Sequence, residues 1–149
     1  MARTGYTVRE ETAILTTVML VEDNQLMREL LSYVVDQEPG LELVAVAEDG
    51  DAAVELGMLT RPQVVVMDVN IPGRDGVEAT RALCRGLPEV RVLILSVSCS
   101  RRLVRLAFAA GACGYLVKDG SHHQLVDAIR SAAAGGSPLA PLVRRLVGE

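Results

Sequence analysis

Five short apolar runs alternate with five longer amphipathic patterns along this chain, and no other feature constrains the fold as strongly. The runs are rich in Val, Leu and Ile, so each predicted strand is buried on both faces. Such strand–helix repeats predict an α/β fold: a doubly wound, five-stranded parallel sheet with five helices and right-handed crossovers. In chain order, the predicted strands and helices lie at residues 17–23, 25–38, 41–49, 50–60, 63–70, 74–87, 90–98, 100–112, 114–117 and 123–136.

The length of 149 residues suits a single domain, and half of the residues are hydrophobic. We expect an N-terminal tail over residues 1–17, the domain over 18–136, and a linker or short C-terminal helix over 137–149. In the first predicted helix, Leu26, Leu30 and Val34 are spaced for one helical face.

Several classes of protein are disfavoured by composition and charge. The apolar runs are shorter than the roughly 18 residues that a membrane span needs, and the first residues show no secretory signal. Three cysteines without metal-type spacing (Cys84, Cys99 and Cys113) predict reduced thiols in a cytoplasmic protein. A net charge of -4 argues against direct nucleic-acid binding.

Chemistry is expected beyond the carboxyl ends of the strands, where doubly wound sheets bind their ligands. A nucleotide-binding fold, such as a flavodoxin-like electron carrier, needs a phosphate-binding loop after the first strand, but this chain has a carboxylate pair there. The residues at the five predicted strand ends are Glu22 and Asp23, Glu48 and Asp49, Asp68, Ser96, and Lys118.

The acidic strand ends predict a cation site. Glu22, Asp23 and Asp68 offer the hard oxygen ligands that Mg²⁺ prefers, although an acidic pair alone is also common in solvated loops. Lys118 is the one lysine among 15 basic residues. An ammonium on a thin stem can reach a crowded carboxylate where a forked guanidinium fits poorly. A chance placement of the lysine is the alternative.

Four stretches together resemble one family. "VEDN" at 21–24, "MDVNIPGRDG" at 67–76, Ser96, and "GYLVKD" at 114–119 resemble the receiver domain of bacterial two-component response regulators, over about residues 18–136. The stretches 71–83 and 109–130 are most similar to its NarL/LuxR-type subgroup. This resemblance implies a flavodoxin-like receiver fold with strand order 2-1-3-4-5.

The resemblance also implies roles for individual residues. Asp68 would accept a phosphoryl group from a sensor histidine kinase. Mg²⁺ would be held by Glu22, Asp23, Asp68 and the backbone carbonyl of Asn70. Lys118 would pair with Asp68 and later with a phosphoryl oxygen.

Two further residues would make the switch. Ser96 would donate its hydroxyl to the phosphoryl group, and Tyr115 would swing inward as that hydroxyl moves. The fourth helix, fifth strand and fifth helix would then report the change to a partner or in a homodimer. Such a domain is not an enzyme, since it catalyses at most its own phosphotransfer and autodephosphorylation. Such a domain controls transcription through a DNA-binding domain. The residues after Gly136 are too few for that domain, so we expect no direct nucleic-acid binding by this chain. We also expect no membrane contact.

One departure from the family pattern defines the main alternative. Val97 follows Ser96 where receivers usually carry Ala or Gly, and it can narrow access to Asp68. The alternative is a receiver-like interaction module that does not depend on phosphorylation. An aspartyl-phosphate phosphatase is disfavoured, because its second acid would stand where this chain has Asn70.

Other polar groups have simpler interpretations. Glu48 and Asp49 predict a polar turn before a helix, and His122 and His123 predict a helix N-terminus rather than a metal site, since adjacent helical residues point in different directions. The arginine cluster predicts a solvated helix face, with partner binding as its alternative; it consists of Arg101, Arg102 and Arg105.

Overall fold

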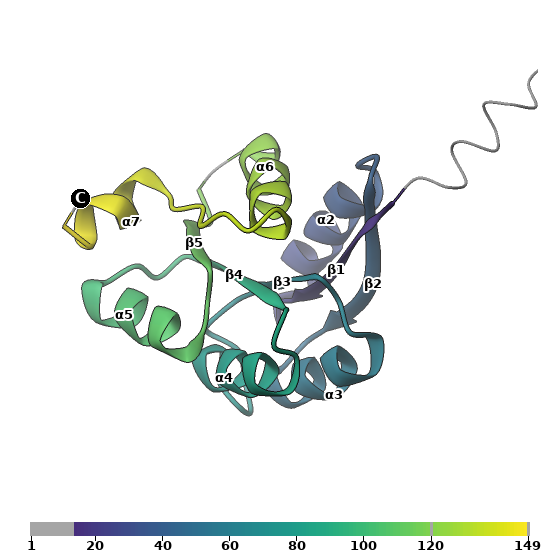
Figure 1. Cartoon of the computed structure of the whole chain (residues 1–149), viewed down its shortest axis with the longest axis horizontal. Helices are drawn as coiled ribbons and strands as arrows, with labels where there is room; N and C mark the ends of the chain where they lie inside the picture. The colour runs from purple at the N-terminus through teal and green to yellow at the C-terminus, as the bar shows by residue number, and fades with distance from the viewer. Residues whose placement is uncertain (1–13, 120, 149) are drawn as a thin grey trace, which may run out of the picture.

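The computed structural model describes residues 14–119 and 121–148, and there a five-stranded parallel sheet forms the centre of the molecule (Figure 1). The strand order is β2-β1-β3-β4-β5, and every neighbouring pair is parallel, which confirms the predicted fold class and topology. The strands are β1 (Thr16–Val21), β2 (Leu41–Ala47), β3 (Val64–Met67), β4 (Arg91–Ser96) and β5 (Gly114–Val117).

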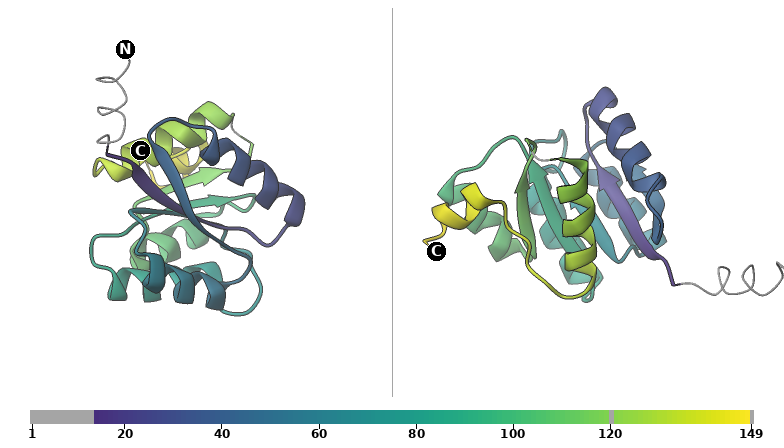
Figure 2. Two further views of the ribbon diagram at one scale, coloured as in Figure 1. Left: turned by 90° about the vertical axis from the view of Figure 1, so that its right-hand side faces the viewer. Right: turned by 90° about the horizontal axis from the view of Figure 1, so that it is seen from above.

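Helices cover both faces of the sheet, as Figures 1 and 2 show. One core contains side chains of α2 and α6, and the other contains side chains of α3, α4 and α5. The short α7 packs against α5 and β5. The helices are α2 (Gln25–Asp36), α3 (Gly50–Thr60), α4 (Gly76–Gly86), α5 (Arg101–Ala110), α6 (His122–Ala133) and α7 (Pro141–Leu146).

The central strand β3 explains why the site after it is rigid. All of its residues are buried, and they lie between the pairing strands β1 and β4. Aliphatic side chains fill both cores, so the backbone that enters the next loop has little freedom.

The three cysteines form no disulfide, and burial raises the pKa of each thiol.

The polar residues that the sequence placed at helix starts lie at the beginnings of α3 and α6. Asp49 caps α3 by accepting a hydrogen bond from the Ala52 N–H at 2.8 Å, so the interpretation of this acid as part of a turn is confirmed. His122 and His123 are the first residues of α6, and both are exposed, as predicted.

The apolar spacing that predicts α2 does not mark the face that this helix buries. Leu26 is 76% exposed and Leu30 is 42% exposed, whereas Leu31 and Val35 are buried. Successive helical residues point about 100° apart, so a stripe displaced by one position faces a different direction. Of the predicted set, Val34 packs against the core, because it lies beside the stripe that contains Leu31 and Val35.

The C-terminal segment runs along β5 before α7 begins. The Tyr115 N–H donates to the Pro138 carbonyl at 3.0 Å, and the Ala140 N–H donates to the Tyr115 carbonyl at 3.0 Å. A Cβ on Gly114 would lie 2.5 Å from the Pro138 oxygen, so this approach requires glycine. Val143 of α7 is fully buried, which anchors the segment.

The first strand starts one residue before its expected position. β1 starts at Thr16, where the Thr16 N–H donates to the Gly40 carbonyl at 2.8 Å. Most of the expected N-terminal tail, residues 1–13, lies outside the described residues. Within the described ranges, every helix is too short or too polar to cross a lipid bilayer.

Candidate functional site

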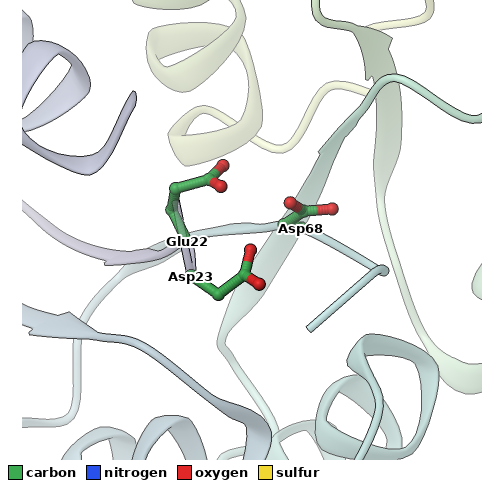
Figure 3. A group of neighbouring side chains, drawn as sticks. All are labelled: Glu22, Asp23 and Asp68. Atoms are coloured by element: carbon green, nitrogen blue, oxygen red, sulfur yellow. The ribbon is translucent and has the colours of Figure 1, made fainter. Parts of the chain in front are cut away.

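Three carboxylates meet at the carboxyl edge of the sheet (Figure 3). Glu22 and Asp23 follow β1, and Asp68 follows the neighbouring strand β3. One oxygen of each lies within 4.8 Å of the others. Glu22 and Asp68 are buried, while Asp23 is exposed, so the cluster is open to solvent on one side only. The structure therefore brings together the acids that the sequence placed at two strand ends.

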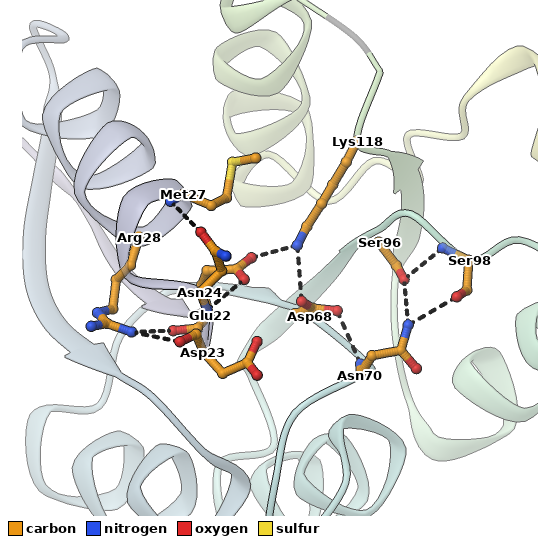
Figure 4. A network of polar contacts seen from close by, with 10 residues as sticks. All are labelled: Glu22, Asp23, Asn24, Met27, Arg28, Asp68, Asn70, Ser96, Ser98 and Lys118. Carbon is orange, nitrogen blue, oxygen red and sulfur yellow. Dashed lines mark hydrogen bonds and ion pairs between the residues drawn. The ribbon is translucent and has the colours of Figure 1, made fainter.

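Lys118 reaches this cluster from the end of β5 (Figure 4). Its Nζ donates to Asp68 Oδ2 at 2.9 Å and to Glu22 Oε1 at 2.5 Å. Burial alone lowers the pKa of Lys118, but the hydrogen bonds and charges of Glu22 and Asp68 outweigh it and hold the pKa above its ordinary value. The lysine is therefore a fixed positive charge between two buried carboxylates.

Backbone contacts hold Asp68 in place. The Asp68 N–H donates to the Val21 carbonyl at 3.1 Å, which continues the pairing of β1 with β3. A Cβ on Gly76 would lie 2.4 Å from the Asp68 carbonyl oxygen, so α4 can begin this close to the acid only with glycine. The glycine of the Asp75–Gly76 turn is thus needed for α4 to pack closely against the site.

Arg28 supports the acidic pair, and sequence reasoning did not identify it. Its Nη1 donates to the backbone carbonyls of Glu22, at 3.0 Å, and Asp23, at 3.2 Å. The Asn24 N–H donates to Glu22 Oε2 at 3.1 Å. The signal that could have found Arg28 is a basic residue about one helical turn after an acidic strand end.

Ser96 and Asn70 lie on the other side of Asp68. The Asn70 N–H donates to Asp68 Oδ1 at 3.0 Å, and the Asn70 Nδ2 lies 3.5 Å from Ser96 Oγ. Ser96 is fully buried at the end of β4. Ser98, which sequence reasoning also missed, accepts a hydrogen bond from Asn70 Nδ2 at 2.9 Å.

Tyr115 is already turned inward in this structure. The ring is fully buried, and its hydroxyl donates to the Ser98 carbonyl at 2.6 Å. Burial raises the pKa of Tyr115 to about 12, so the phenol stays protonated as a donor. By contrast, Val97 is 71% exposed beside the site.

The arginine cluster lies apart from these groups, on α5. Arg101, Arg102 and Arg105 are exposed, and among the described residues none of the three takes part in an ion pair. They share that exposed surface with Leu106. The structure thus brings together all predicted site residues around Asp68 and leaves these arginines outside the group.

Comparison with known proteins defines the family. The family model of the response regulator receiver domain matches residues 18–130. The chain belongs to this family and is a receiver domain of the two-component response regulators, of the NarL, LuxR and DegU type.

Curated relatives are longer than this chain. The transcriptional regulatory protein DegU of Brevibacillus brevis is 39% identical over 140 residues, which are 89% of this chain and 59% of DegU. The nitrate/nitrite response regulator protein NarP of Escherichia coli is 35% identical over 132 residues, which are 89% of this chain and 61% of NarP. The chain therefore spans about three fifths of the length of these relatives.

Two solved structures of response regulators have the same fold as this chain. A LuxR-family two-component response regulator from Aurantimonas superposes with a TM-score of 0.85 at 34% identity, covering 89% of this chain and 95% of that chain. The signal receiver domain of the putative response regulator NarL from Mycobacterium tuberculosis has a TM-score of 0.78 at 31% identity, covering 82% of this chain and 98% of that chain.

Proposed function

We propose that Asp68 is the phosphoryl acceptor of this receiver domain, that the domain acts in the cytoplasm and that a sensor histidine kinase is its donor. The observation that carries the proposal is the position of Asp68, buried between the acidic pair and the ammonium of Lys118. A carboxylate in this place can act as a nucleophile, because its position is fixed and the charge around it is balanced by a neighbouring cation.

The transfer step follows from the contacts of Asp68. A carboxylate oxygen of Asp68 forms a new P–O bond, and the P–N bond of a phosphohistidine donor breaks, leaving its electron pair on the imidazole. Lys118 remains protonated and loses part of its contact with Asp68 Oδ2 to a phosphoryl oxygen. The product is an acyl phosphate on Asp68.

The residues around Asp68 fit a magnesium ion. Glu22, Asp23 and Asp68 supply hard oxygen atoms, and the single ammonium of Lys118 offsets only part of their negative charge. These residues and the backbone carbonyl of Asn70 would hold Mg²⁺, which offsets charge on the phosphoryl oxygens during transfer. Because Asp23 is exposed, one side of the site is open to water and to the phosphoryl donor.

The phosphoryl group would act as a switch rather than as a substrate for turnover. It adds a charge of roughly -1.5 to -2 and three strong acceptor oxygens. The Ser96 hydroxyl would donate to one of them, and Tyr115 would respond through the loop between β4 and α5. Beyond its own phosphotransfer and autodephosphorylation, the domain would catalyse nothing.

The output would be a protein contact. The surface formed by α5, β5 and α6 carries the exposed Arg101, Arg102 and Arg105, which suit a partner or a second copy of the domain. Control of transcription would pass through a DNA-binding region of the kind found in longer regulators, and the described residues themselves would bind no nucleic acid.

Val97 supports the alternative of a phosphorylation-independent interaction module. Its side chain is exposed directly beside Ser96, where it can slow the approach of a bulky donor. In that case Val97→Ala would increase the rate of labelling of Asp68.

The experiment that tests the proposal is intact mass after incubation with acetyl phosphate and Mg²⁺. One added phosphoryl group is expected on the wild type, and none on Asp68→Asn or in the presence of EDTA. Lys118→Arg is expected to label poorly, because the forked guanidinium does not fit between the two carboxylates. If the wild type binds Mg²⁺ and still stays unlabelled, the acceptor role is contradicted and the interaction module becomes the better account.

A further inference from the structure

The outer side of α3 carries a stripe of two acids and a leucine. Asp51, Glu55 and Leu59 follow one another at intervals of four residues, so they lie on one side of the helix. All three are exposed, and Leu59 is 77% exposed. Asp51 has an exposed ion pair with Arg74, whereas within the described ranges Glu55 takes part in no ion pair. An acid without a partner and a large apolar side chain thus face solvent together.

The outer side of α5 carries the same spacing with the opposite charge. Arg101, Arg105 and Ala109 also follow one another at intervals of four residues, and all three are exposed. Arg102 and Leu106 lie beside them, and the five residues line a shallow hollow. Leu106 and Ala109 form its apolar end, toward the C-terminus of the helix. This hollow therefore has a basic end and an apolar end, in the same order as the acidic and apolar parts of the α3 stripe.

The arginines of α5 stand where a helix disfavours positive charge. Arg101 and Arg102 are in the first turn, which contains no acid. The N-terminal end of a helix carries a partial positive charge, so a cation there is unfavourable and a nearby anion is favourable. Over residues 14–119 and 121–148, neither arginine has an acid within ion-pair distance. An acidic surface placed against α5 would supply the missing negative charge.

The two helices run in the same direction on the same face of the sheet, with α4 between them (Figure 1). α3 connects β2 with β3, and α5 connects β4 with β5. Because all strands are parallel, both helices run opposite to the strands and parallel to each other. α4 separates the two stripes within one molecule, so a contact between them needs a second copy of the chain.

We propose that the acidic stripe of α3 in one copy of this chain docks on the arginine stripe of α5 in a second copy. When the two helices lie side by side and parallel, the equal spacing matches each acid with an arginine and the leucine with the apolar end of the hollow. The matched pairs are Asp51 with Arg101, Glu55 with Arg105, and Leu59 with Ala109. Because the contact joins two different patches, two copies related by a two-fold axis can make it twice.

This inference deepens the proposed contact of the arginines with a partner or a second copy, and it rests on that part of the proposed function. It adds the acidic stripe of α3 as the surface that the arginines bind. It does not depend on phosphorylation of Asp68, so the two ideas can fail separately.

The contact is expected to be weak and sensitive to salt. Each exposed ion pair contributes little, and burial of Leu59 adds an apolar contribution. The Debye length falls from about 30 Å at about 0.01 M salt to about 8 Å at about 0.15 M, so added salt screens the ion pairs. Salt also screens the general repulsion between copies of a chain with a net charge of -4. Dissociation by salt is therefore a sign of the specific contact.

The first experiment measures self-association of the full chain at low salt, without a phosphoryl donor. Sedimentation equilibrium at millimolar protein concentration gives the dissociation constant, and backbone NMR spectra recorded against concentration locate the contact. Amide signals of α3 and α5 should shift with concentration, and those of α2 and α6 should not. The proposal is overturned if the chain stays monomeric, if added salt strengthens its association, or if the shifts lie on α2 and α6 alone.

The second experiment reverses one charge on each stripe. Glu55→Arg and Arg105→Glu should each weaken self-association about tenfold, because a reversal removes an attraction and adds a repulsion. An equimolar mixture of the two variants should recover the wild-type association. In that mixture the intact Glu55 and Arg105 belong to different variants and can pair, and the two reversed residues again have opposite charges. A mixture that associates no better than either variant alone contradicts the assigned pair.

The matched control is Glu29→Arg, which makes the same change of charge at an exposed position on α2. It should associate as the wild type does, and a loss equal to that of Glu55→Arg would overturn the proposal. Both reversals make a chain of net charge -4 less negative, so neither weakens association through general repulsion.

Intact mass after addition of acetyl phosphate and Mg²⁺ to the same samples separates this proposal from the acceptor role. A wild type that associates and takes up no phosphoryl group contradicts the acceptor role and supports the contact between α3 and α5. A wild type that is labelled on Asp68 and shows no association at low salt overturns the contact and leaves the acceptor role standing.

Discussion

Replacing Lys118 with Met tests how strongly the two buried carboxylates depend on its charge. Lys118 Nζ lies 2.9 Å from Asp68 Oδ2 and 2.5 Å from Glu22 Oε1. With an effective dielectric constant of about 20, each contact contributes about 6 kcal/mol of Coulomb energy before desolvation is subtracted. Because desolvation of the three groups offsets most of this energy, we expect a net loss of about 3 to 5 kcal/mol in the free energy of unfolding.

Urea unfolding at neutral pH, with and without Mg²⁺, measures this loss. Mg²⁺ should stabilise Lys118→Met more than the wild type, because it supplies the missing positive charge among the acids. Arg130→Met is the matched control: its ion pair with Glu38 is solvent-exposed, so at most about 1 kcal/mol is expected. If both variants lose the same small amount, the buried carboxylates do not need Lys118 and the reasoning is refuted.

Three further predictions concern pH, packing and the loop after β1. Because the pKa of Lys118 is raised, the stabilisation by its charge is complete below pH 10.5 and is lost as the pH rises through the pKa of the folded state. The free energy of unfolding in urea should therefore fall less steeply with rising alkaline pH in Lys118→Met than in the wild type. Gly76→Ala should lower the free energy of unfolding, measured in urea, by about 1 to 3 kcal/mol. Gly86→Ala should lower it by less, because a Cβ on Gly86 meets only the flexible end of the Met58 side chain. Arg28→Gln should weaken Mg²⁺ binding about tenfold by calorimetry, with unchanged affinity contradicting its support of the acidic pair.

Much of the site could be predicted because its residues stand at strand ends. In a parallel sheet the order of the strands decides which ends are neighbours, and Asp68 therefore lies beside Glu22 and Asp23 once β1 pairs with β3. Lys118 was expected to reach Asp68, and it does. Its second bond, to Glu22, depends on the length of the loop and was not predictable from spacing.

The features that sequence reasoning missed depend on loop paths and on backbone groups. Ser98 acts through its N–H and carbonyl as well as its hydroxyl, and every residue except proline carries such an N–H, so no pattern marks it. Arg28 likewise binds carbonyl oxygens. On α2, apolar residues are dense enough to fit two stripes, and contact with the sheet selected the one that contains Leu31 and Val35.

The bonds between Tyr115 and the C-terminal segment have a consequence for shortened forms of the chain. β5 is the last strand of the sheet, and residues 138–140 lie along its outer side. A form that ends at residue 136 would leave that side of β5 bare. Bare strand edges recruit strands from other molecules, so such a form would self-associate at high concentration, in a way unrelated to any regulatory dimer.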